Sequence, residues 1–394
     1  MATWQFSESA GAYQEAVRQD VKRQAAISED VRSVYASEAP FAFRTAIAEA
    51  RAARLLPLKG EGRLAASEYA LAAQTAFHLR RAAASDSLLG NNRYRHEDLG
   101  YDLPRRLADL QRDAPKLYGL DPDASLRAGD RWAARGRACV ALGVAAVLTA
   151  MGAACVLRPS GLRHPAPAGR RVLRSLEIIP QPATAPHGRR RAVLLHLLVF
   201  VLPMLLPLGQ ILAAGGEQRA LAEASRKGVQ LSASIGAQGQ LAAFVTESLR
   251  TAQVADLTAT ARELAALDTE STAEEAEHER KMAAVEGVLA VHVQKIAEYM
   301  GRAPTAQDRV DAETVTALRK QPGGQADALA EQRHQVDLAE RAGRRSLLLS
   351  AAAALAFVAE ILSVATTTVR SRSWRWWPAA GAMASVGLTA AAVL

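Results

Sequence analysis

Two ionisable side chains stand inside long apolar stretches of the sequence, where an ionised group is costly to bury. His196 lies in the stretch 192–214, which has no full charge, and Glu360 is the one charged residue of the stretch 346–366. Counted along each helix at about 1.5 Å per residue, the two lie at similar depths from one end of their stretches. A His196–Glu360 hydrogen bond would satisfy both groups. This pair is a candidate for proton relay or transport, and its alternative role is to fix the packing of two helices.

No other group of residues has the spacing of a catalytic or metal-binding motif. The sequence contains no nucleophile elbow, phosphate-binding loop, dinucleotide fingerprint or His-Glu metal motif. The two cysteines, Cys139 and Cys155, lie on one predicted helix, about 24 Å apart at the helical rise, which is too far for a disulfide. We therefore predict a non-enzymatic protein with no metal and no cofactor.

The segment 90–104, GNNRYRHEDLGYDLP, is the most varied polar stretch of the chain. Its amide, imidazole and carboxylate side chains could form a site. The alternative is a solvated loop in which Gly, Asn and Asp supply turn geometry. His96, Glu97 and Asp98 follow one another directly and lack the spacing of metal ligands on a helix, which favours the loop.

Four apolar stretches have the composition of membrane-spanning helices. A helix needs about 20 apolar residues to cross a hydrocarbon core of about 30 Å. The stretches cover residues 138–157, 192–214, 346–366 and 378–394. The last has only 17 residues, and its small-residue repeat, Gly381 with Ser385, predicts close packing against another helix.

Prolines and tryptophans mark particular points of these stretches. Pro203 and Pro207 lie within the second one and predict a kinked helix, since proline frees backbone carbonyls. Trp374, Trp376 and Trp377 alternate with arginines between the third and the fourth. Tryptophan is enriched at membrane–water interfaces, so we expect these three to be interfacial anchors.

The composition favours helix nearly everywhere else. The chain is 49% hydrophobic but only 5% aromatic, and its apolar residues are mostly Ala, Leu and Val. No segment alternates as a strand would. We predict an all-α, multi-pass membrane protein with about four spans and two extramembrane helical domains, bundle-like or coiled-coil-like, at 1–136 and 215–345. The connectors between spans are 158–191, rich in Pro and Arg and expected to be disordered, and 367–377, rich in Arg and Trp.

Helical spacing also predicts which side chains are buried. In the N-terminal domain a helix over about 10–38 should end at Pro40, which removes a backbone donor. A later helix, about 63–89, should bury Leu64, Leu71, Phe77 and Leu88 or Leu89. In the insert, a helix over about 273–300 carries a clear apolar stripe. The long run before it, to about Leu267, has sparse apolar positions: Leu221, Leu231, Ile235, Val245, Leu249, Leu257 and Leu264.

The net charge of +8 is concentrated in one connector. Residues 158–191 contain eight arginines and one acidic residue, Glu177. A nucleic-acid-binding protein would spread such charge over a folded face, so we expect no nucleic acid. The partners we expect at the Arg-rich connectors are the lipid bilayer and its anionic headgroups.

The orientation in the membrane stays open. Arg-rich connectors favour the cytoplasmic side, which would place both helical domains outside. The domain-side ends of the spans are equally basic, however. They carry Arg127, Arg131, Arg135, Arg137, Arg219, Arg226, Lys227, Arg341, Arg344 and Arg345.

These features together predict a membrane protein that acts through its helical domains in partner binding, sensing or assembly, as a homo-oligomer or with another protein. Its outline resembles helical-bundle sensors placed between two spans. The alternative is a small transporter or channel subunit that uses the pair of His196 and Glu360. The Arg- and Ala-rich composition resembles proteins of GC-rich actinobacteria, so we expect a bacterial plasma membrane.

Overall fold

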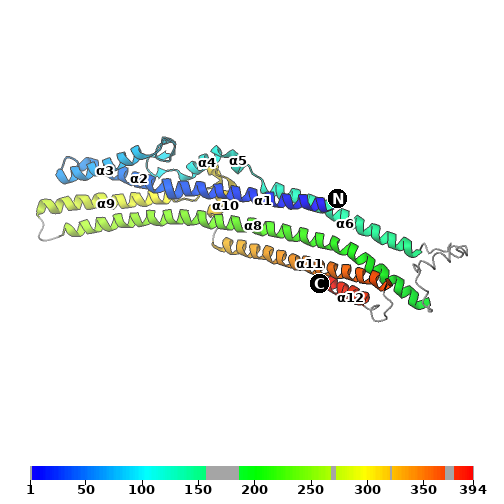
Figure 1. Ribbon diagram of the computed structural model, residues 1–394. Coiled ribbons are helices and arrows are strands. Elements are labelled where there is room, and N and C mark those ends of the chain that lie inside the picture. Colours follow the sequence, from blue (N-terminus) through cyan, green and yellow to red (C-terminus); the bar gives the residue numbers. More distant parts are fainter. Residues whose placement is uncertain (1, 157–185, 268–271, 320–321, 369–376, 394) are drawn as a thin grey trace. The chain divides into compact units, whose positions relative to one another are not determined.

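The computed structural model describes residues 2–156, 186–267, 272–319, 322–368 and 377–393. These residues are almost entirely helical, which confirms the all-α prediction (Figure 1). The elements are α1 (Ala2–Val31), the π-helix η1 (Arg32–Glu38), α2 (Ala39–Leu55), η2 (Leu56–Leu58), α3 (Arg63–Ala82), η3 (Asn92–Tyr94), β1 (Arg95–His96), β2 (Gly100–Tyr101), α4 (Leu103–Asp113), α5 (Pro115–Tyr118), α6 (Pro122–Val156), α8 (Pro186–Ala265), α9 (Ala273–Met300), η4 (Ala306–Asp308), α10 (Ala312–Arg319), α11 (Pro322–Thr368) and α12 (Trp377–Val393).

The chain divides into two compact units. Unit 1 comprises Met1–Arg18, Asp121–Ser225 and Glu331–Leu394. Unit 2 comprises Gln19–Leu120 and Arg226–Ala330. Segments from the N-terminal region and from the insert therefore share one core in unit 2, and both regions also contribute to unit 1.

The core of unit 2 is built from large side chains on several elements. Helix α2 packs against α3 and α9 (Figure 1). The apolar stripe expected over 273–300 lies on α9, where Met282, Val293 and Met300 are fully buried. The largest fully buried residues of the unit are Tyr35, Tyr94, Tyr101, Ile27, Leu55, Leu88, Leu103, Leu107, Met282, Ile296 and Met300.

Pro40 does not end the first helix, contrary to the prediction. Helices α1, η1 and α2 follow one another without a gap, and Pro40 is the second residue of α2. The π-helical segment before it explains this, because the Ala39 N–H bonds to the Val34 carbonyl, five residues back. The wider turn accommodates the proline, which an α-helical turn would not.

Helix α3 contradicts the burial predicted for it. Leu64, Leu71 and Phe77 are 66%, 67% and 57% exposed. The buried positions of α3 are Ala65, Ala72 and Ala76. Alanines let α3 approach α2 closely, so the large side chains are left on the outer face.

Small residues form the contact between α11 and α12 in unit 1. On α12, Gly381 lies so close to Ala359 of α11 that a Cβ at Gly381 would come within 3.0 Å of the Ala359 Cβ. Ser385 donates its hydroxyl to the Ala352 carbonyl at 2.8 Å, and Ala352 and Ala356 are buried. This is the close packing that the Gly381–Ser385 spacing predicts.

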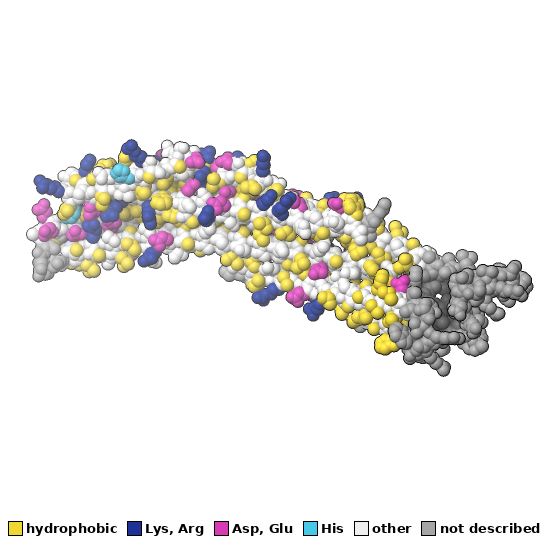
Figure 2. Space-filling model, in the orientation of Figure 1, with side chains coloured by type: hydrophobic (Ala, Val, Ile, Leu, Met, Phe, Trp, Pro, Cys, Tyr) yellow, Lys and Arg dark blue, Asp and Glu magenta, His cyan; other side chains and the backbone are white. Residues whose placement is uncertain are grey.

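Within the described residues, two helical stretches are long and apolar enough to cross a membrane: Pro115–Thr149 and Gly324–Leu362. Only 11% and 17% of their most apolar windows are buried, whereas the core helix of a soluble protein would be mostly buried. The stretches 192–214 and 378–394 remain predictions. In Figure 2, hydrophobic side chains dominate the visible surface over the later part of α11 and over α12, while charges of both signs are spread over α2, α3 and α9.

Candidate functional site

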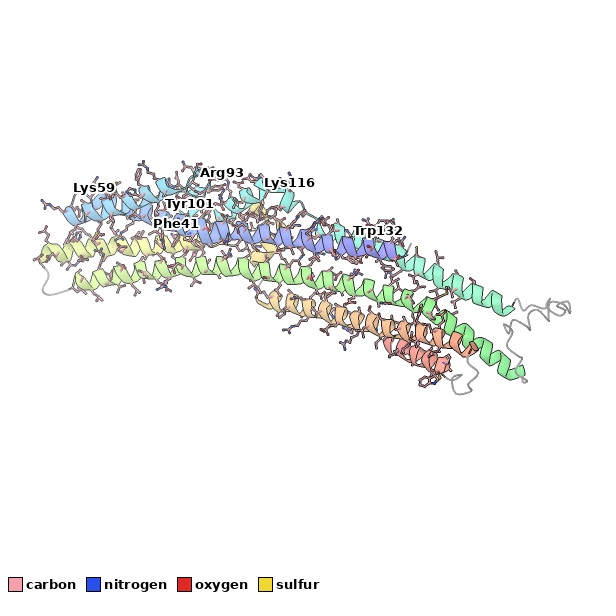
Figure 3. All side chains as sticks on the ribbon, viewed as in Figure 1. Phe41, Lys59, Arg93, Tyr101, Lys116 and Trp132 are labelled. Atoms are coloured by element: carbon pink, nitrogen blue, oxygen red, sulfur yellow. The ribbon has the colours of Figure 1, made fainter. Side chains whose placement is uncertain are left out.

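The polar segment 90–104 is a structural hairpin. Strands β1 and β2 pair antiparallel, with Arg95 opposite Tyr101. Two residues per strand are too few for alternation to show in the sequence, which is why no strand was predicted. Tyr101, labelled in Figure 3, is buried, and Gly100 has φ +88° where a Cβ would come 2.9 Å from the Met300 sulfur of α9. Glycine at this position allows both the turn and the contact.

The polar side chains of the hairpin hold the backbone. Asn91 accepts a hydrogen bond from the Arg93 N–H at 3.1 Å, and Asp102 caps α4 by accepting from the Arg105 N–H at 3.2 Å. Asp102 also accepts from Arg302 at 3.0 Å. These contacts support the loop interpretation over a catalytic one. The described residues include no group of three His, Cys, Asp or Glu side chains that could hold a metal ion.

Two carboxylate clusters connect elements of unit 2, one around Glu38 and one around Asp109. Arg106 on α4 donates to both oxygens of Glu38 on η1, at 3.0 and 2.7 Å, and the Leu88 N–H donates to the same carboxylate at 2.8 Å. These bonds connect the π-helix to α4 and to the chain before the hairpin. Such charge-assisted, two-pronged pairs are strong when little exposed, as here.

The second cluster surrounds Asp109 of α4. The Tyr94 hydroxyl donates to it at 2.9 Å, and Arg93 and Arg112 form ion pairs with it at 2.9 and 2.6 Å. Burial by itself would raise the pKa of Asp109, but the Tyr94 hydrogen bond and the two arginines outweigh it, so the pKa lies below its usual 3.8. This carboxyl is held ionised and structural.

Of the intramembrane pair predicted from the sequence, the structure describes the side chain of Glu360 but not that of His196. Glu360 lies on α11 and is half-buried, and His196 lies in the described backbone of α8, but its side chain is outside the described residues. Helix α8 continues through Pro203 and Pro207. A transport role for the pair stays a prediction.

Of the three expected anchors, Trp377 begins α12 and is 61% exposed. Trp374 and Trp376 lie outside the described residues.

The most distinctive surface of unit 2 is an uncharged line along α8. Ile235, Leu249, Leu257 and Leu264 are 50%, 39%, 67% and 64% exposed. From Ile235 to Leu264 is 29 residues, or eight turns at about 3.6 residues per turn, so the line runs straight along the helix. We call it the α8 stripe: Ile235, Gly239, Ala242, Thr246, Leu249, Gln253, Leu257, Thr260 and Leu264, all of them exposed.

A hollow of about 440 Å³ lies beside the stripe, between α8 and the segment formed by η1 and α2. Gly236, Gly239 and Ala243 of α8 line one side, and Pro40 and Phe43 of α2 line the other. Cβ atoms at Gly236 and Gly239 would meet no neighbour. The hollow leaves room for side chains of a molecule packed on the stripe.

The sequence prediction did not identify this surface, because the apolar positions of α8 are sparse and diluted by small and polar residues. The face of α8 turned into unit 2 is made largely of small residues, with Ala237, Ser248 and Ala252 buried alongside Leu241 and Phe244. The recurrence of Ile235, Leu249, Leu257 and Leu264 without any charge on the same azimuth was the available signal. Comparisons with known protein families, with characterised proteins and with solved structures found no match to this chain.

Proposed function

We propose that this chain is a non-enzymatic, multi-pass protein of a bacterial plasma membrane whose unit 2 assembles with a second copy of the chain along the α8 stripe. The four spans would be the apolar parts of α6, α8, α11 and α12. The sequence predicts partner binding, sensing or assembly, and the stripe favours assembly. The observation that carries it is an exposed, uncharged line about 44 Å long, at about 1.5 Å per residue, along which Ile235, Leu249, Leu257 and Leu264 recur.

Absence of charge on the stripe favours a second copy as the occupant. Two copies inserted the same way in one membrane are related by a two-fold axis along the membrane normal, so their α8 helices would run parallel. In register, each residue of the stripe then meets its own counterpart. A charged residue on the line would face an identical charge, and the stripe has none.

The flanks of the stripe are complementary in the same arrangement. Arg250 lies on one edge and Asp256 on the other, both exposed. Parallel pairing brings Arg250 of one copy beside Asp256 of the other, on both sides of the axis. Gln253 lies mid-stripe, where a polar residue in a coiled-coil seam is a known means of fixing register.

Cysteine cross-linking in membranes tests the proposal. In a background with Cys139→Ala and Cys155→Ala, Leu249→Cys or Leu257→Cys should form disulfide-linked dimers under mild oxidation. Gln294→Cys, exposed on α9, is the matched control and should stay monomeric. The dimer should also appear by mass photometry of the native chain, and Leu257→Glu should abolish it.

Three results would overturn assembly on the stripe. They are a monomeric native chain, equal cross-linking at Gln294→Cys and Leu249→Cys, and capture of a different protein at Leu249→Cys in place of the dimer. The last would assign the stripe to a partner of another kind.

A further inference from the structure

A second surface lies in unit 1, where four helices meet at one level. The ring of Phe6 on α1 lies against Gly136 of α6 and Gly215 of α8, so that a Cβ at either glycine would come within 2.7 or 3.1 Å of the ring. Gly343 of α11 lies against the Glu217 carboxylate of α8. These contacts place the residues around Gly136, Gly215 and Gly343 at about the same height in the unit.

Exposed arginines gather at this level. Arg131, Arg135 and Arg137 lie within five residues of Gly136, and Arg344 and Arg345 lie within two of Gly343. All five are exposed. Within the described part of the chain, the ion pair they make is the loose one of Arg344 with Glu340, at 3.7 Å with side chains 75% and 63% exposed. Their charge is therefore largely uncompensated.

Two tryptophans accompany the arginines. Trp4 and Trp132 contact edge to face, with ring centroids 5.3 Å apart, and the Arg135 guanidinium lies 4.8 Å from the centroid of the Trp132 ring. Trp132, labelled in Figure 3, lies on α6 one turn before Gly136. Trp4 is 55% exposed, although a large ring of this kind is normally buried.

The surface changes character across this level. On one side the side chains are polar and paired, as in the hydrogen bond of Tyr13 to Asp130 at 2.9 Å and the ion pair of Arg219 with Asp130 at 3.2 Å. On the other side Leu142 of α6 and Leu347 of α11 are 71% and 70% exposed. Exposed leucines next to arginines and tryptophans are the arrangement found where a helix leaves the hydrocarbon of a bilayer.

We propose that this Arg–Trp collar, formed by Trp4, Trp132, Arg131, Arg135, Arg137, Arg344 and Arg345, binds the phosphate headgroups of acidic phospholipids. The inference rests on the membrane insertion in the proposed function and is independent of assembly on the α8 stripe. It differs from the headgroup contacts expected at the connectors, because the collar lies at the opposite ends of the same helices. Guanidinium groups donate in a planar fork that fits phosphate oxygens, and the tryptophans fix the depth.

Competition between two lipids tests the collar in the full-length protein. The purified chain in detergent is offered equal amounts of phosphatidylglycerol and phosphatidylcholine, and retained lipids are counted by native mass spectrometry. We expect the native chain to prefer phosphatidylglycerol. A basic residue at an anionic surface contributes about fivefold, so the triple variant Arg135→Gln, Arg344→Gln, Arg345→Gln should lower the preference about a hundredfold.

Two further variants separate the collar from net charge and from folding. The matched control is Arg18→Gln, Arg32→Gln, Arg280→Gln, which removes the same charge at side chains 66%, 61% and 60% exposed elsewhere, and it should keep the preference. The variant Arg135→Lys, Arg344→Lys, Arg345→Lys should keep most of it. Helical circular dichroism confirms that each variant is folded.

Each remaining outcome overturns the collar in a recognisable way. Equal loss in the collar and control variants would mean a net-charge effect. Displacement of phosphatidylglycerol by excess inorganic phosphate would mean a site for the free anion. Equal retention of both lipids by the native chain would reject the collar but keep membrane insertion, while retention of neither would reject both.

Discussion

The core of unit 2 and the contact between α11 and α12 in unit 1 bury different kinds of residue. Unit 2 encloses tyrosines, leucines and methionines, and its helices are fastened by arginine–carboxylate pairs such as Arg106 with Glu38. In unit 1, α11 and α12 pack through alanine, glycine and serine, as between Ala352 and Ser385, and Phe357 and Ile361 of α11 are left 59% and 60% exposed. The first is how helices are stabilised in water, and the second is how they associate where the solvent is itself apolar.

The contrast shows that exposed apolar residues have different meanings in the two units. In unit 1 they cover both candidate membrane helices and surround small-residue contacts. In unit 2 they occur next to exposed charges, as at Leu64 beside Arg63 on α3 and along the α8 stripe. We attribute the first to lipid contact and, for the stripe, the second to assembly.

Loss of the Glu38 carboxylate should cause the largest effect. Glu38→Gln leaves the nearly buried Arg106 without its countercharge, and breaking such a pair destabilises by about 4 kcal/mol. Hydrogen exchange of the α4 amides in the full chain measures this loss. Glu29→Gln, in the exposed pair with Arg32, is the control and should change exchange little. Equal effects would mean that the Glu38 pair is not structural.

A charge on the exposed face of α11 should be nearly as costly. Ile361→Glu places a carboxylate in the candidate span, where an acidic residue at the helix centre costs about 3 kcal/mol. The matched variant Leu71→Glu, at a side chain of similar exposure on α3, should cost less than about 0.5 kcal/mol. The fraction of each variant recovered in membranes measures the difference. Similar recovery would remove the distinction between the units.

Acid should weaken unit 2 through Asp109. Because the pKa of Asp109 is lowered in the folded chain, its stabilisation is present above the usual 3.8 and is lost as pH falls through the folded value. Asp109→Asn should cost about 2 kcal/mol at pH 7 and show a shallower loss of stability below pH 4. Burial raises the pKa of Asp30 and Glu313, and these two act in the opposite direction.

Thermal unfolding at several pH values measures how the stability of the native chain and of the Asp109→Asn variant changes with pH. Parallel curves for the native chain and the Asp109→Asn variant would contradict the role of the cluster.

The Ser385 hydrogen bond should contribute least. Ser385→Ala removes the bond to the Ala352 carbonyl, and if α11 and α12 span the membrane as proposed, such a contact contributes about 0.6 kcal/mol. Ser385→Leu should cost more, because the residue is fully buried in close packing. Heat resistance of the detergent-solubilised chain compares the two. A larger loss for alanine than for leucine would reject the packing described for α12.

The sequence predicted which segments are helical more accurately than it predicted which side chains are buried. The helix start at Pro122 was predictable because Asp121 precedes it, and its side chain accepts the Ala124 N–H at 2.8 Å. The α9 stripe was predictable because six apolar residues share one face. The buried faces of α3 and α8 were not predictable, because alanine favours helix but does not indicate which face of the helix packs against the core.

The rest depended on contacts between residues far apart in sequence. The ion pair of Glu38 with Arg106 forms only when the chain has folded. The same holds for the contacts that bring Gly136, Gly215 and Gly343 to one height in unit 1. Pro40 was misjudged because a π-helical turn leaves no simple mark in the sequence. The pairing of His196 with Glu360 stays a prediction from the sequence.

Spin-label accessibility tests the central claim, that unit 1 contacts lipid and unit 2 contacts water. In the Cys139→Ala, Cys155→Ala background, labels are attached at Ile361→Cys and Leu71→Cys, two exposed apolar sites, and the protein is placed in liposomes. The account predicts fast relaxation by oxygen and little by a water-soluble nickel complex at position 361, and the reverse at position 71. Equal access of the nickel complex to both positions would contradict it.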